Sequence, residues 1–90
     1  MQNGGIDLAD IKLTKDCYVP KENINFYVAY ESNAVKSDVR KKRRDQLVFD
    51  YTNGKKILSV VYLKTGHLII TNTSAATISQ RIIAAESGRG

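Results

Sequence analysis

The stretch LVFDYTNGKKILSVVYL, residues 47–63, carries the strongest local structural signal in this 90-residue chain. Asn53-Gly54 stands between two apolar runs, and this dipeptide readily supplies the two positive-φ residues of a type I′ turn. The stretch therefore predicts a β-hairpin with Lys55 and Lys56 at its tip. A second turn, KTGH, leads into HLIITN and extends the prediction to a three-stranded antiparallel meander over about residues 47 to 72.

The segments around this meander predict further strands and two helices. Residues 23–30 alternate apolar and other side chains with the period of two that is typical of a strand, and residues 6–13 repeat the pattern. Residues 32–45 change to a helical period with Ser32 as the N-cap. A last helix, capped by Thr73 or Ser74, would turn three apolar side chains inward: Ile78, Ile82 and Ala85.

These elements predict an α+β fold. We expect a small single domain over residues 1–90, with an antiparallel sheet of about four or five strands and two short helices. The ends, residues 1–5 and 86–90, are expected to be flexible. The N-terminus lacks the features of a signal peptide and the longest apolar run is too short to span a bilayer, so we expect a cytoplasmic protein without a membrane partner.

The strand expected near residues 57–63 raises a question of burial. An antiparallel strand with one solvated face alternates polar and apolar residues, but this one is apolar on both faces. Two short helices cover one face, and we expect a second copy of the chain to cover the other, which makes the protein a homo-oligomer. The candidate interface residues on this strand are Leu58, Val60 and Tyr62. The alternative is that the N-terminal strands fold over the second face.

Positive charge is concentrated in one part of the chain. The formal net charge is +5, and residues 36–64 contain nine basic side chains against three acidic ones. This excess indicates a patch that attracts polyanions. Two groups are candidates for contacts with a phosphate backbone: the end of the first helix and the hairpin tip, with Arg40, Arg43, Arg44, Lys55 and Lys56. The alternative for the helical group is that it only solvates the helix.

The residues offer little for readout of bases or for catalysis. Neither basic stretch combines Asn, Gln and Arg along one helix for base edges, and no aromatic platform is interleaved with the basic residues. The single His67 and the single Cys17, which we place in a loop, match no recognised metal or nucleophile pattern. We expect no enzyme, metal, cofactor or small-molecule substrate. An enzyme would have to use His67 and Asp50, assembled across a subunit interface.

Two segments, ESNAVKSDVR and LVFDYTNGKKILSVVYLKTGHLIITNTSAATISQRI, resemble the RemA family of small bacterial regulators of the extracellular matrix. The resemblance extends from about Ile11 to Ile83. It implies a sheet similar to the LytTR DNA-binding domain and a role as a DNA-binding transcriptional regulator of biofilm-matrix genes. It also implies closed rings of about seven or eight subunits whose basic rim binds double-stranded DNA.

The resemblance assigns roles to particular positions. Family members carry DNA-contacting arginines where Lys55 and Lys56 stand, so these two lysines inherit that role. The family's arginine in the first loop corresponds to Asn23, and Lys21 beside it becomes the candidate contact. A basic residue that usually follows the turn is replaced by Leu58. Arg81, a family marker in the last helix, joins the candidate oligomer interface. A structural ring and an RNA-binding module are the alternative functions.

Overall fold

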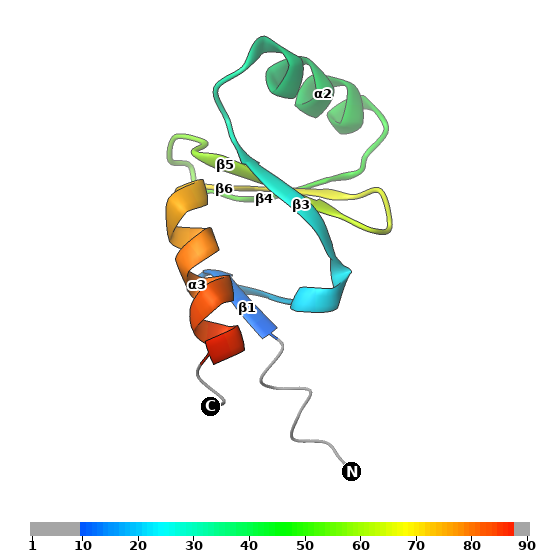
Figure 1. The fold of residues 1–90 in the computed structure, drawn as a ribbon. Coiled ribbons are helices and arrows are strands. Elements are labelled where there is room, and N and C mark those ends of the chain that lie inside the picture. Colours follow the sequence, from blue (N-terminus) through cyan, green and yellow to red (C-terminus); the bar gives the residue numbers. More distant parts are fainter. Residues whose placement is uncertain (1–9, 88–90) are drawn as a thin grey trace.

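The computed structural model describes residues 10–87 as an α+β domain of three layers (Figure 1). Helix α2 lies above the four-stranded sheet, and a two-stranded hairpin and helix α3 lie below it. The elements in chain order are β1 (Asp10–Thr14), β2 (Cys17–Pro20), the 3₁₀ turn η1 (Lys21–Asn23), β3 (Ile24–Ala29), α2 (Asn33–Arg44), β4 (Val48–Tyr51), β5 (Ser59–Leu63), β6 (Leu68–Thr71) and α3 (Ala75–Ser87).

The predicted helices and their caps are confirmed. The Ser32 hydroxyl accepts a hydrogen bond from the Val35 amide at 3.2 Å, which starts α2. Ser74 does the same for α3, because its hydroxyl accepts from the Thr77 amide at 3.1 Å. The strand expected over residues 23–30 is β3, and the strand expected over 6–13 is present as β1 from residue 10 onward, with residues 6–9 outside the described part of the chain.

The predicted hairpin between residues 47–51 and 57–63 is wrong in its strand pairing. The sheet order is β3-β5-β6-β4, so β6 lies between the two strands that were expected to pair. Strand β4 pairs with β6 in parallel register, Val48 opposite Leu68 and Tyr51 opposite Thr71. The antiparallel pairing of β5 with β6 across the KTGH turn is confirmed. The Asn53-Gly54 turn still reverses the chain, but it carries the backbone past the end of β6 to reach β5.

Burial explains why β6 and not β4 is central. The sequence of a strand that is covered on both faces is a continuous run of apolar residues. All four residues of β6 are buried, whereas Phe49 and Asp50 in β4 are exposed, as suits an edge strand. The Asn-Gly turn signal is local and specifies a reversal of direction. It does not specify which strand occupies the neighbouring position.

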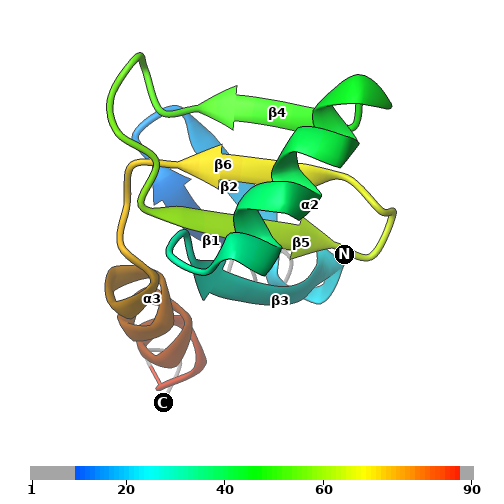
Figure 2. The ribbon, with the colours of Figure 1, turned by 90° about the horizontal axis from the view of Figure 1, so that it is seen from above.

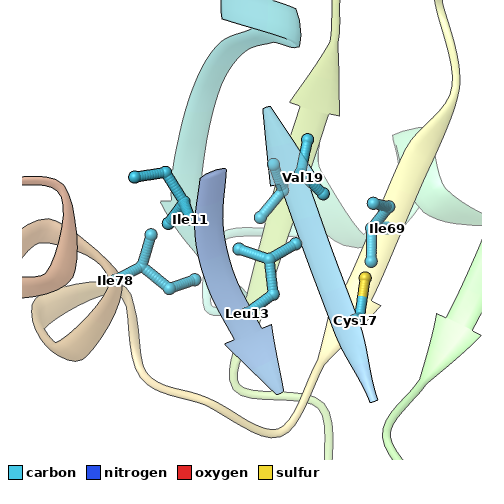
Figure 3. Packing of buried hydrophobic residues seen from close by; sticks show 7 residues of the cluster. Ile11, Leu13, Cys17, Val19, Ile69 and Ile78 are labelled. Atoms are coloured by element: carbon cyan, nitrogen blue, oxygen red, sulfur yellow. The ribbon is translucent and has the colours of Figure 1, made fainter. Parts of the chain in front are cut away.

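Both faces of β5 are covered within one chain. Val60 faces α2 and packs in a cluster with Val39 and Ile70. Val61 faces the other way, into a cluster with Ile69, the β1–β2 hairpin and α3. Figure 3 shows the hairpin residues of this second cluster directed at the sheet. The prediction that a second copy covers this face is therefore wrong, and the alternative of N-terminal strands folding over it is correct.

The predicted position of Cys17 is also wrong. This residue was expected in a loop, but it begins β2 and its side chain is buried against the sheet (Figure 3). Burial raises the pKa of its thiol.

The flexible C-terminal end was expected to begin at residue 86, but Glu86 and Ser87 are the last residues of α3. The rest of the expectation, for residues 1–5 and 88–90, lies outside the described residues. No helix in the described range is long and apolar enough to cross a membrane.

Candidate nucleic-acid interface

The C-terminal half of α2 presents a cluster of exposed cations. Its last turn consists of four consecutive basic residues, at the helix end where the backbone carbonyls favour positive charge. Lys42 in this turn lies 3.6 Å from the carboxylate of Asp38 and is partly neutralised by it. The remaining cations, which we call the helix cluster, are exposed: Arg40, Lys41, Arg43 and Arg44.

The orientation of α2 is fixed by contacts with the sheet below it. Val39 is buried beneath the helix. At the preceding residue, the Asp38 carboxylate accepts a hydrogen bond of 2.8 Å from the Tyr62 hydroxyl. Burial and this bond together raise the pKa of Tyr62 to about 12, so the phenol stays protonated and keeps donating. The helix cluster therefore stands on a helix whose position over the sheet is fixed by these contacts.

The second group of cations lies on the connection between β4 and β5. Asn53 and Gly54 have φ angles of 57° and 78°, as the predicted turn requires. The Lys55 amide closes this turn by donating to the Thr52 carbonyl at 3.0 Å. Lys55 and Lys56, which we call the turn pair, are both exposed.

The carboxylate of Asp50, in strand β4, supports this turn. Asp50 Oδ1 accepts hydrogen bonds from the Thr52 hydroxyl at 2.6 Å and from the Thr52 amide at 2.9 Å. These two bonds, with a smaller contribution from the charge of Arg43, hold the pKa of Asp50 below its usual value. The turn pair thus stands on a turn that is fixed by both backbone and side-chain bonds.

The helix cluster and the turn pair lie at opposite ends of β4 (Figure 2). The chain enters β4 from the C-terminus of α2 and leaves it toward the turn at Asn53. Four strand residues correspond to about 13 Å, which is close to the width of the major groove of DNA, about 12 Å. The two basic groups are thus separated along the chain by the length of β4.

Lys21 lies apart from both groups. It opens η1, at the end of the molecule opposite α2 (Figure 1, cyan), and forms an ion pair with Glu86 of α3. Of the six residues predicted to contact DNA, the structure thus groups Arg40, Arg43 and Arg44, separately groups the turn pair, and leaves Lys21 elsewhere.

The residues predicted for the oligomer interface also lie in different parts of the structure. Val60 is 0% exposed under α2, so its side chain belongs to the core and is not available to another copy. Leu58 is 40% exposed, and Tyr62 is half-buried and stacks on Phe26 with ring centroids 4.3 Å apart. Arg81 lies on α3, on the other side of the sheet, where it donates hydrogen bonds to backbone carbonyls of β1.

His67 and Asp50, the pair weighed for catalysis, each have a local partner. His67 Nδ1 lies 2.8 Å from the Thr65 hydroxyl, and the ring stacks on Phe49 at 5.4 Å. Asp50 is bound to Thr52 as described above. Within residues 10–87, His, Cys, Asp and Glu form no group of three or more that could hold a metal ion.

Two further cations near the turn pair were not predicted from the sequence. Lys12 on β1 and Lys15 in the β1–β2 turn lie around the same cleft as Lys55 and Arg81. Their signal in the sequence is weak, because they are isolated lysines far from the basic segment. Only the folding of the N-terminal hairpin under the sheet brings them near the turn pair.

The fold and its fixed basic groups define a small α+β protein with an electropositive surface. This chain belongs to the RemA-like family: the family model, described as extracellular matrix regulatory protein A-like, matches residues 11–82. The resemblance stated from the sequence is thereby confirmed. A comparison with curated proteins finds no match.

Proposed function

We propose that this protein binds the phosphate backbone of double-stranded DNA and acts in the cytoplasm as a transcriptional regulator of the extracellular-matrix type. Family membership supports the regulatory class. The observation that carries DNA binding is the pair of fixed basic groups at the two ends of β4. Because contacts within the chain already fix the helix and the turn, their backbone loses little freedom when the cations meet a phosphate backbone, and this contributes to affinity.

Self-association completes this proposal. A single copy with a few phosphate contacts binds weakly, whereas a ring that repeats the same contacts gains affinity through effective concentration. Two features favour association between copies. The sheet ends in two edge strands, β3 and β4, and the exposed apolar side chains of Phe26 and Leu58 lie on or beside the β3–β5 ladder. DNA bending around such a ring would then favour deformable sequences.

Single substitutions at matched positions test the placement of the contacts. Lys56→Ala removes one charge from the turn pair, and Lys64→Ala removes one charge from the turn at the other end of β5. Both lysines are exposed, so neither change disturbs the core. Fluorescence anisotropy with a labelled duplex should give a loss of about five- to tenfold for Lys56→Ala and a smaller loss for Lys64→Ala.

The oligomeric state is measured on the same samples by light scattering. The proposal expects both variants to keep the mass of the parent protein, because neither lysine is assigned to contacts between copies. Equal losses of affinity for the two variants would indicate binding by net charge alone. Failure of the parent protein to bind duplex DNA at low salt would contradict the proposal and leave a structural ring as the better description.

A further inference from the structure

A cleft of about 450 Å³ opens at the edge of the molecule where four separate segments converge. These segments are the end of β1 with the following turn, the β4–β5 turn, the β6–α3 connection and the side of α3. Figure 2 shows the first three on the same edge of the sheet. The side chains around the cleft are Lys12, Thr14, Lys15, Asn53, Lys55, Asn72, Thr73 and Arg81.

The charge of this cleft is entirely positive. Four of its side chains are cations and the other four are neutral hydroxyls or amides, with no carboxylate among them. Within residues 10–87 the ion pairs are Lys21 with Glu86 and Lys42 with Asp38, and neither includes a residue of the cleft. Four cations gathered around one cavity repel one another, so an anion bound there would be stabilising.

Hydrogen bonds hold the wall of the cleft in place. Arg81 Nη1 donates to the carbonyl oxygens of Lys12 at 2.9 Å and of Leu13 at 3.3 Å. The Thr73 hydroxyl donates to the same Leu13 carbonyl at 2.6 Å. Both bonds of Arg81 use Nη1, which leaves the Nε and Nη2 donors of its guanidinium for a ligand. The site is thus built from bonded segments and is not a chance gathering of mobile lysines.

The composition of the lining defines the kind of ligand. The volume is in the range of small-molecule sites, but no aromatic or aliphatic side chain lines the cavity, so there is no surface for a base or an acyl chain. Ammonium, guanidinium, amide and hydroxyl donors together match the oxygens of a phosphate group. We propose that this cleft binds the phosphate groups of a compact, multiply charged phosphorylated anion.

This site is independent of the proposed DNA contacts except at Lys55, which belongs both to the cleft and to the turn pair. Phosphate can therefore reach it from two sources: a free phosphorylated molecule or a backbone phosphate of DNA. A free anion held at Lys55 would weaken DNA binding by occupying one of its contacts, which would make the cleft a point of regulation.

Calorimetric titration with inorganic pyrophosphate tests the proposal on the full-length protein. The informative variant is Lys12→Gln/Lys15→Gln, because both lysines are exposed and removing their charges leaves the Arg81 and Thr73 bonds to the backbone intact. The matched control, Lys41→Gln/Arg44→Gln, removes two charges from the helix cluster. We expect saturable binding of one pyrophosphate per chain, weakened about tenfold or more in the cleft variant and less than about twofold in the control.

Two results would overturn the proposal. One is the absence of saturable pyrophosphate binding by the parent protein at physiological ionic strength. The other is an equal loss of affinity in the cleft variant and the control, which would mean that only the overall charge attracts the anion. Amide chemical shifts of Asn53, Asn72 and Thr73 give a second readout, because they should move on titration while those of α2 stay in place.

Duplex binding by the same variants identifies the source of the phosphate. If the cleft variant loses pyrophosphate but keeps the parent's affinity for duplex DNA, the result supports a free ligand. If it loses both, the result supports a DNA phosphate in the cleft. The pyrophosphate titration does not depend on DNA, so failure of the proposed DNA function would leave this result unaffected.

Discussion

Two buried hydroxyls show how single residues stabilise the end of the sheet. Ser59 Oγ and Thr71 Oγ1 lie 2.7 Å apart on neighbouring strands, and both residues are 0% exposed. Thr71 Oγ1 also donates to the Thr73 carbonyl and accepts from the Thr73 amide. A hydroxyl has one hydrogen, so Ser59 must be the donor to Thr71. Thr71 is therefore the centre of this network, and it fixes the start of the connection to α3.

The two members of the pair should differ in their effect on stability. Thr71→Val leaves the buried Ser59 hydroxyl and both Thr73 groups without their partner, and should lower the free energy of unfolding by about 2–3 kcal/mol. Ser59→Ala leaves the Thr71–Thr73 bonds intact and should cost about 1 kcal/mol. Urea denaturation of the two variants measures this difference. A greater loss for Ser59→Ala would show that the donor assignment is wrong.

The protonation of Asp50 should make the stability of the turn that carries the turn pair depend on pH. Its pKa is lowered in the folded protein, chiefly by the hydroxyl and amide of Thr52. A lowered carboxyl pKa contributes stability that is present above the ordinary value, about 3.9, and is lost as the pH falls through the lower folded-state value. Thr52→Val removes the hydroxyl bond, so we expect the pKa of Asp50 to rise toward its ordinary value in a carbon-detected NMR titration. An unchanged pKa would contradict the role of Thr52.

At the scale of the element, α2 depends on its N-cap. Its first turn contains no acidic residue, so the Ser32 hydroxyl bond to the Val35 amide is the main local support of that end. Ser32→Ala should destabilise the protein by about 1 kcal/mol. Ser37→Ala, at an exposed position inside the same helix, is the control and should be neutral or slightly stabilising because Ala is the better helix former. Thermal denaturation that gave equal effects for the two variants would argue against capping.

Local signals predicted most elements correctly, and the exceptions were the strand order and strand β2. Both helices, their serine caps and the positive φ angles of Asn53 and Gly54 follow from short-range chemistry that the sequence displays directly. The neighbour of β4 depends on a pairing with β6 between residues 20 positions apart, which no turn signal encodes. The hairpin strand β2 was missed because the turn before Cys17 contains neither Gly nor Asn.

The candidate site was predictable only in part, because the arrangement of the three layers decides which residues come together. The helix cluster and the turn pair could be identified from the sequence, because a run of basic residues is recognised without knowledge of the fold. Their separation by the length of β4 and the pairing of Lys21 with Glu86 depend on the three layers. The same layering explains how one chain covers both faces of β5, which the apolar pattern had assigned to contacts between copies.

We propose that the fixed basic groups bind duplex DNA from an assembly of several copies. The most direct test of this proposal is the affinity of the protein for a labelled duplex across a salt series, with the mass in solution determined by light scattering. We expect a high-order oligomer whose log affinity falls with log salt at a slope of about −0.9 for each phosphate contacted, summed over the copies that touch the duplex. A monomer, or an oligomer indifferent to DNA at low salt, would contradict it.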